Sequence, residues 1–441
     1  MPMTAVAMLS MHTSPLAQPG TGDSGGMNVY VRELAASLAQ AGVRTTVYVR
    51  RWTADLPERV LVEPLMEVVH VPVGPIDAPK EALPDLVDGF AEWVGADLVD
   101  GRHLRLRAPG RRGADRRESY RLLDTSTAEN PRTVLHANYW LSAVAGHRLK
   151  HGLGLPLVTT FHTLARVKAV GGDPEPSRRE RAEQAVIGCS DVVCASSRAE
   201  ARQIVGLYDA PADRIEIVPP GVDHAFFSPG DRRGARAALG LGEGPVLLFV
   251  GRIQPLKGLD VAVEALARLA PEVTLLAVGG PSGPEGPVEL ERIRDRIHRL
   301  GLGDRVRFVD PQPHHLLSTY YRAADLTLVP SRSESFGLVA AESAACGTPV
   351  VAAAVGGLTS LVVDGVTGRL LDERHPSAWA SAIASLLDDP ARRREMAHAA
   401  FLDANRYRWA TSAARLRRIY SDLTIAGADS ATALVDCDAL R

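Results

Sequence analysis

The second half of the chain holds two cations and two carboxylates whose positions suit an extended phosphorylated ligand. Arg252 and Lys257 follow the apolar run 246–250, which is typical of a buried strand. Open α/β sheets bind ligands at the carboxyl ends of their strands, where cations would neutralise a departing diphosphate. Glu334 and Glu342 are separated by seven residues, which predicts one carboxylate at the mouth of a helix and the other two turns into it. We expect the two carboxylates to reach different parts of one ligand.

A glycine-rich run at residues 20–28 is the second feature that suits a ligand. It follows the first apolar segment and opens the helix expected near Asn28. Glycines allow a close approach of the backbone, and a helix N-terminus favours an anion. The spacing is not the dinucleotide fingerprint, so a flexible loop is the alternative, and a Rossmann dehydrogenase is disfavoured.

The elements that must position these residues follow an alternating pattern of strands and helices. This rhythm predicts an α/β fold with two parallel sheets, each covered by helices. The expected strands are 5–9, 45–49, 68–73, 134–137, 157–160, 191–195 and 215–218 in the first half, and 246–250, 273–278, 306–309, 326–329 and 350–354 in the second. The pattern breaks at 218–222, so we predict domains at 1–220 and 221–425, a last helix near 409–423 and a disordered tail at 426–441.

Composition points to a small-molecule partner. Lysine plus arginine (50) nearly balance aspartate plus glutamate (52) over 441 residues, which does not favour nucleic acid or a membrane. Cys189, Cys194, Cys346 and Cys437 form no C-x-x-C pair and are interpreted as packing residues in a cytoplasmic protein. The arginine-rich segment 101–130 is interpreted as a solvated surface insertion.

The motifs together resemble a known family. The two glutamates, the strand 347–351 that follows them, the Gly356-Gly357 pair, and Arg252 with Lys257 resemble the retaining GT-B enzymes of glycosyltransferase family 4, over about residues 4–425. The resemblance implies two Rossmann-like domains facing each other across a cleft, with the C-terminal helix packing back on the N-terminal domain. It implies UDP-N-acetylglucosamine as the donor and catalytic roles for Arg252, Lys257, His162 and Glu334. The implied donor-binding residues are Gln18, Pro19, Gly26, Arg252, Lys257, Gln312, Glu334 and Glu342.

Within that family, the runs 12–28, 136–142 and 162–164 resemble members that glycosylate an inositol phosphate in mycothiol biosynthesis. The implied acceptor-binding residues are His12, Asp23, Ser24, Gly25, Gly26, Met27, Asn28, Lys80, Tyr139, Thr163 and Arg178. Because residues 168–181 are shortened relative to the family, Arg179 or Arg181 is an alternative to Arg178. The implied Mg²⁺ contacts are largely main-chain oxygens, at Tyr321, Arg322 and Ala324, together with the Thr348 hydroxyl.

The resemblance also implies the mechanism, in which front-face attack retains the configuration of the transferred sugar. The sequence shows no carboxylate pair suited to a retaining glycosidase, whose two groups lie about 5 Å apart. We expect domain closure about residues 219–222 to exclude water. Three alternatives stay open: transfer to another cyclitol or sugar, nucleotide-sugar epimerisation, and non-catalytic sensing. A homodimer is a further possibility.

Overall fold

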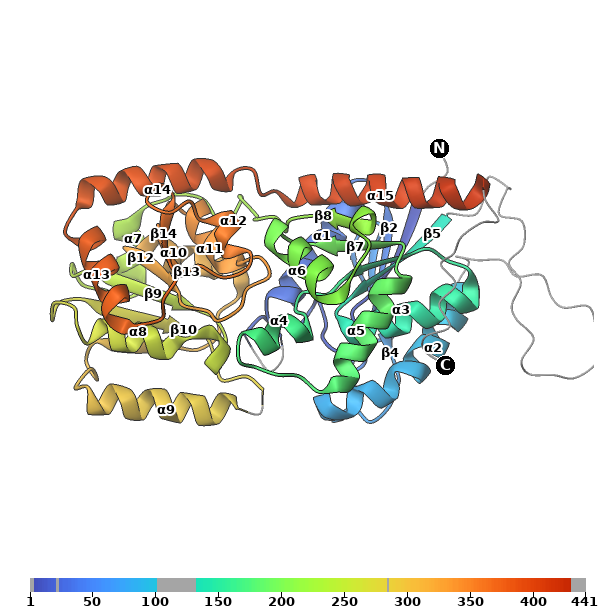
Figure 1. The fold of residues 1–441 in the computed structure, drawn as a ribbon, viewed down its shortest axis with the longest axis horizontal. Helices are drawn as coiled ribbons and strands as arrows, with labels where there is room; N and C mark the ends of the chain where they lie inside the picture. The colour runs from blue at the N-terminus through green and yellow to red at the C-terminus, as the bar shows by residue number, and fades with distance from the viewer. Residues whose placement is uncertain (1–3, 21–23, 101–131, 284, 430–441) are drawn as a thin grey trace, which may run out of the picture.

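The structure is a computed structural model that describes residues 4–20, 24–100, 132–283 and 285–429 (Figure 1). The predictions for Asp23, Cys437, the arginine-rich insertion and residues 430–441 lie outside these residues. Two sheets, each covered by helices on both faces, form two α/β units that lie side by side. The predicted fold class is confirmed.

The first unit contains an eight-stranded sheet in the order β3-β4-β2-β1-β5-β6-β7-β8. Its strands are β1 (Thr4–Leu9), β2 (Arg44–Arg50), β3 (Arg59–Glu63), β4 (Met66–Val71), β5 (Arg132–Asn138), β6 (Leu157–Thr160), β7 (Val192–Ala195) and β8 (Ile215–Ile217). Its helical elements are α1 (Gly26–Gln40), η1 (Lys80–Leu86), α2 (Val87–Asp100), α3 (Trp140–Leu153), α4 (Ala165–Val170), α5 (Ser177–Cys189), α6 (Arg198–Tyr208) and η2 (Ala212–Arg214). Sequence reasoning missed β3, an antiparallel edge strand with no buried residue.

The second unit contains a six-stranded parallel sheet in the order β11-β10-β9-β12-β13-β14. Its strands are β9 (Val246–Val250), β10 (Thr274–Val278), β11 (Val306–Val309), β12 (Leu326–Val329), β13 (Val350–Ala353) and β14 (Gly368–Leu371). Its helical elements are α7 (Arg232–Ala238), η3 (Pro255–Lys257), α8 (Leu259–Leu266), α9 (Gly286–Arg299), η4 (His314–Leu316), α10 (Leu317–Ala323), α11 (Leu338–Ala345), α12 (Leu358–Leu361), α13 (Pro376–Leu387) and α14 (Pro390–Ala404).

Strand β9 shows why this sheet is covered on both faces. Leu247 and Phe249 belong to the apolar core that includes α8 and α13. Val246 and Leu248 point the other way, into the core formed with α10 and α11. Alternate side chains of one strand therefore enter two cores, as expected for a parallel sheet between two helical layers.

The C-terminal helix α15 (Trp409–Asp429) returns to the first unit and lies against α1 (Figure 1). Gly221 packs directly against the start of this helix, because a Cβ added to it would lie 2.1 Å from the backbone nitrogen of Trp409. On the returning helix, the buried Tyr420 hydroxyl lies 2.6 Å from Nδ1 of the buried His136 on β5. Helix α15 extends to Asp429, so it includes the start of the segment 426–441 predicted as a tail.

Replacing Tyr420 by phenylalanine should lower the stability of the first unit. The substitution would leave Nδ1 of buried His136 without its hydroxyl partner, which costs about 1–3 kcal/mol in the free energy of unfolding. Urea unfolding followed by circular dichroism measures this change, with Arg418→Ala on the exposed face of the same helix as the control. Equal urea midpoints for Tyr420→Phe and the wild type would show that the contact contributes nothing.

Candidate active site

The carboxyl end of β9 carries Arg252 and Lys257 into the space facing the first unit. Lys257 ends the short helix η3, and its Nζ lies 2.5 Å from Oε1 of Glu334. The Ser331 hydroxyl donates a hydrogen bond to the same oxygen at 2.9 Å. Sequence motifs separated by more than 70 residues therefore meet at one edge of the sheet, as the strand ends predicted.

The Gly356-Gly357 pair holds the backbone of Glu334 in place. Gly357 donates its N–H to the Glu334 carbonyl at 2.8 Å, and a Cβ on Gly356 would lie 1.9 Å from that oxygen. Gly356 also has a φ of +48°, which favours glycine. The glycines are thus needed because two backbones pack directly against each other beside the glutamate.

Glu342 lies on α11 and is 4% exposed. One of its oxygens lies 2.7 Å from Nε2 of His314, and the other accepts a hydrogen bond from the Tyr321 hydroxyl at 2.9 Å. Both residues come from the η4–α10 segment. Sequence reasoning missed His314, because only the folded chain brings the loop after β11 to this helix. Its partners fix the orientation of the Glu342 carboxylate.

His314 should make the stability of the second unit depend on pH. Burial lowers its pKa, but Glu342, with smaller contributions from Glu33 and Asp223, outweighs burial and raises the pKa above the ordinary 6.5. The ion pair therefore stabilises the fold fully below about pH 6.5 and loses this effect as the pH rises through the raised pKa. We expect His314→Gln to lower the melting temperature more at pH 6 than at pH 9.

The matched control for that measurement is His298→Gln, because His298 is exposed on α9. Its melting temperature should follow the wild type at both pH values. If His314→Gln lowered the melting temperature equally at both pH values, the charged pair with Glu342 would not be the cause.

The first unit meets this edge through its glycine-rich segment. A Cβ on Gly25 would lie 3.4 Å from Nε of Arg252, and one on Gly26 would lie 3.4 Å from a methyl carbon of Leu338. The Gln18 amide donates to the Pro311 carbonyl at 2.9 Å, and Ser335 Oγ donates to the His162 carbonyl at 2.5 Å. The predicted residues of both halves therefore face one another across the same space.

Asn28 fixes the start of α1. Its side-chain oxygen accepts the Gly25 N–H at 2.9 Å, and its amide donates to Thr13 Oγ1 at 2.6 Å and to the Ser14 carbonyl at 2.5 Å. The buried Ser24 hydroxyl belongs to the same network, since it lies 3.5 Å from Thr13 Oγ1. These contacts shape the loop that the sequence predicts to bind the acceptor.

The other residues predicted around this loop have different surroundings. Met27 packs against both apolar cores of the first unit, and Pro19 is half-buried. The Gln312 amide bonds to the Asp310 carbonyl in an exposed setting.

His162 and Tyr139 follow the ends of β6 and β5 with unusual backbone conformations. Their φ angles are +63° and +75°, in the left-handed region that non-glycine residues rarely adopt. Nε2 of His162 lies 2.9 Å from Oδ1 of Asn138. Burial, together with nearby His136, lowers the pKa of His162 to about 3, so its imidazole is neutral at physiological pH. Strain of this kind at two adjacent strand ends is typical of a functional site.

Arg179, rather than Arg178, joins the predicted phosphate-binding residues. Its NH1 donates to the Tyr139 hydroxyl at 3.2 Å, and its NH2 donates to Thr163 Oγ1 at 3.0 Å. Arg178 instead contacts Asp85 at the surface. Successive residues of a helix point about 100° apart, so the two neighbours on α5 face different surroundings. Arg179, an alternative left open by the shortened segment 168–181, is therefore the arginine that lies beside Tyr139 and Thr163.

A cluster of cations surrounds His12, whose ring lies 4.2 Å from that of Tyr139. Burial first, and then Lys80, His162, Arg179 and Arg252, lower the pKa of His12. Its Nδ1 is buried and has no hydrogen-bond partner in the described part of the chain. These groups come from both units, so the space between them favours anionic ligands.

An acidic loop lies beside this cluster and was not anticipated. Glu175 forms an ion pair with Arg179 at 2.9 Å and a second pair with Lys168. Despite burial, Arg179 and the lysines Lys168 and Lys80 lower the pKa of Glu175, so it stays ionised. Glu183 pairs with Arg179 Nε from the next turn of α5 at 2.7 Å and holds the guanidinium in place.

The residues predicted to bind Mg²⁺ would offer it main-chain oxygens and one hydroxyl group. Thr348 Oγ1 donates its proton to the Tyr321 carbonyl at 2.6 Å. The Arg322 side chain bonds to the Ser228 carbonyl at 2.8 Å, and Ala324 ends α10. Mg²⁺ is usually held by carboxylates and waters, and this set offers no carboxylate. The magnesium site stays a prediction without support in these contacts.

Comparison with known proteins assigns the family. The model of "Glycosyltransferase Family 4" matches residues 24–226, and that of "Glycosyl transferases group 1" matches residues 231–403. A curated D-inositol 3-phosphate glycosyltransferase of Xylanimonas cellulosilytica is 44% identical and covers 95% of this chain and 97% of its own length. The chain belongs to glycosyltransferase family 4. The predicted family and the enzyme class, a hexosyltransferase, are confirmed.

Other relatives of this family-4 glycosyltransferase extend over nearly its whole length. The protein named D-inositol 3-phosphate glycosyltransferase in Thermobispora bispora is 42% identical over 95% of this chain and 94% of its own. Among solved structures, sucrose-phosphate synthase of Thermosynechococcus elongatus has a TM-score of 0.83 and 31% identity, covering 96% of this chain and 100% of the other. Anabaena HepE, solved with UDP and glucose, has a TM-score of 0.72 at 20% identity, covers 95% of this chain and 100% of its own, and shows the shared fold.

The family-4 glycosyltransferase has no helix among its described residues that is both long and apolar enough to cross a bilayer.

Proposed function

We propose that the enzyme transfers N-acetylglucosamine from UDP-N-acetylglucosamine to 1D-myo-inositol 3-phosphate, with retention of configuration. The observation that carries this proposal is the position of Arg179 beside Tyr139 and Thr163, across from Arg252. A guanidinium with two hydroxyl groups is suited to a phosphate monoester. The names of the curated relatives support the same acceptor.

The donor lies at the carboxyl end of β9 in this proposal. Arg252 and Lys257 contact the diphosphate, and Glu342 accepts hydrogen bonds from the ribose hydroxyls. Glu334 accepts from a sugar hydroxyl while it keeps its contacts with Lys257 and Ser331. Carboxylates suit hydroxyl donors, and the two cations stabilise the charge that grows on the leaving UDP.

The acceptor lies on the first unit, with its phosphate near Arg179, Lys80 and His12. When the phosphate arrives, it replaces Glu175 as one partner of the Arg179 guanidinium, while Glu183 keeps holding Nε. The inositol ring then lies against residues 24–28, beside Arg252. This placement brings the attacking hydroxyl group next to the departing diphosphate.

Retention follows from attack on the same face that UDP leaves. The departing phosphate oxygen then accepts the proton of the acceptor hydroxyl. Because the acceptor itself attacks from that face, no enzyme carboxylate is needed as a nucleophile. His162 is neutral and oriented by Asn138, which suits a hydrogen bond to the hydroxymethyl group of the sugar. The chain contributes mainly positioning and charge stabilisation.

A matrix of UDP-release assays tests the proposal. The purified enzyme is given UDP-N-acetylglucosamine or UDP-glucose, each with 1D-myo-inositol 3-phosphate, with unphosphorylated myo-inositol or with no acceptor. We expect fast release only with the first donor and the phosphorylated acceptor. Equal release with and without any acceptor would contradict transfer, and an epimerised donor would identify an epimerase.

If UDP is released with UDP-N-acetylglucosamine and a different cyclitol, the protein is still a glycosyltransferase, but that cyclitol is its acceptor. The cytoplasmic location, the place in mycothiol biosynthesis and a homodimer stay predictions.

A further inference from the structure

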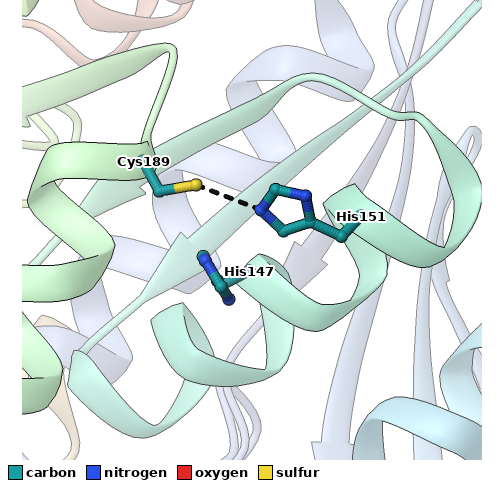
Figure 2. Close-up of side chains that lie close together, drawn as sticks. All are labelled: His147, His151 and Cys189. Atoms are coloured by element: carbon teal, nitrogen blue, oxygen red, sulfur yellow. Dashed lines mark hydrogen bonds between the residues drawn. The ribbon is translucent and has the colours of Figure 1, made fainter. Parts of the chain in front are cut away.

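Two histidines and a cysteine from α3 and α5 bring their side-chain ends together (Figure 2). His147 and His151 lie one turn apart on α3, and Cys189 is the last residue of α5. One ligand atom from each residue lies within 4.8 Å of the others, and His151 Nε2 is 3.1 Å from Cys189 Sγ. Histidines four residues apart share one face of a helix, so both rings reach α5.

This arrangement has the ligand types and dimensions of a zinc site. Zinc is held by imidazole nitrogen at about 2.0–2.1 Å and by thiolate sulfur at about 2.3 Å, usually with four ligands. Tetrahedral ligands at those lengths lie roughly 3.3–3.7 Å from one another. The imidazole rings of His147 and His151 have their centroids 4.6 Å apart. Small side-chain rotations would therefore place all three atoms around one ion.

The surroundings prepare these side chains for a metal. The side chain of His147 is buried between α3 and α5, so its position is fixed by packing. The fully buried Lys150 donates to the Cys189 carbonyl at 2.8 Å and pairs with Asp191 at 2.7 Å, which fixes the end of α5 beside α3. His151 is exposed, so an ion has access from solvent.

The redox state of Cys189 decides whether its sulfur is a ligand. Cys194 and Cys346 are buried thiols, in keeping with a packing role, but Cys189 is disulfide-bonded in the structure. A phosphine delivers two electrons to the disulfide and water supplies two protons, so the disulfide becomes two thiols while the phosphine becomes its oxide. The Cys189 thiol then releases one proton when it binds a metal as a thiolate.

We propose that His147, His151 and reduced Cys189 form a zinc site that joins α3 to α5, with solvent in the fourth position. The two helices begin near the active site, where Tyr139 precedes α3 and Arg179 lies in the first turn of α5. Zinc would therefore hold together the helices whose N-terminal ends frame the acceptor site. This zinc site does not depend on which acceptor the enzyme uses.

Metal titration of the tag-free, full-length enzyme, reduced with a phosphine, tests this site. We expect one Zn²⁺ per chain, with affinity about tenfold weaker or more in His151→Ala and in Cys189→Ser. Co²⁺ should give the intense visible bands of a tetrahedral ion and a near-ultraviolet thiolate band that Cys189→Ser abolishes. Zinc should raise the melting temperature of the wild type, but much less that of His151→Ala.

The control variant is His398→Ala, which removes an exposed histidine from α14 and should bind zinc like the wild type. The phosphine-free oxidised enzyme should bind zinc more weakly than the reduced one. Equal zinc affinity in the wild type, His151→Ala and Cys189→Ser would overturn the proposal. So would a cobalt spectrum without the thiolate band.

Discussion

Replacing Lys257 by alanine should lower kcat by about 10²–10³-fold, because it removes one of two cations expected on the leaving diphosphate. The loss should be the same for every acceptor, since UDP departs in each reaction. Glu334 would keep the Ser331 hydroxyl as a partner at 2.9 Å, so the loop around it should stay in place. Steady-state UDP release measures kcat, and circular dichroism checks the fold.

Arg294→Ala is the control for this prediction. Arg294 is an exposed cation of the same unit that pairs with Glu291 on α9 at 2.8 Å. The Arg294→Ala variant should have the same kcat as the wild type. If Lys257→Ala stayed within twofold of the wild type, the diphosphate would have to bind elsewhere.

The second large effect concerns the acceptor. Arg179→Lys should raise KM for the phosphorylated acceptor about 10–100-fold, because lysine cannot reproduce the hydrogen bonds that a guanidinium makes to a phosphate and to its neighbours. Affinity for UDP should change little, because Arg179 belongs to the first unit. Lysine keeps a positive charge beside buried Glu183, which protects the fold. Initial rates at varied acceptor concentration and calorimetric titration with UDP separate the two effects.

The adjacent residue supplies a matched control. Arg178→Ala removes a side chain that contacts Asp85 at the surface, so it should leave KM for the acceptor unchanged. The opposite order, with Arg178→Ala impaired and Arg179→Lys normal, would reverse the assignment of the phosphate site.

Residues near strand ends were predictable because the alternating pattern fixes where each parallel strand ends. Lys257 and Glu334 are examples, since both follow strands of one sheet and meet at its edge. The Gly356-Gly357 pair could be recognised as a motif, but the sequence does not show why glycine is needed at these positions. Only the fold shows that these glycines pack on the backbone of Glu334.

Other parts could not be predicted because they depend on side-chain direction or on distant contacts. Choosing between Arg178 and Arg179 requires knowing which of the two faces Tyr139. The sequence does not fix how α5 is rotated about its own axis. Strand β14 (Gly368–Leu371) was missed because it is short and no residue after its first is fully buried. The spacing of His147 and His151 is visible in the sequence, whereas the approach of Cys189 appears only when α3 and α5 pack together.

The most direct test of the central claim is the identity of the product. UDP-N-acetylglucosamine and 1D-myo-inositol 3-phosphate are incubated with the wild-type enzyme, and the isolated product is analysed by mass spectrometry and NMR. We predict the mass of one N-acetylglucosamine joined to one inositol phosphate, with the small anomeric coupling of a retained α-linkage. Free N-acetylglucosamine with unmodified acceptor, or a β-linked product, would contradict the account.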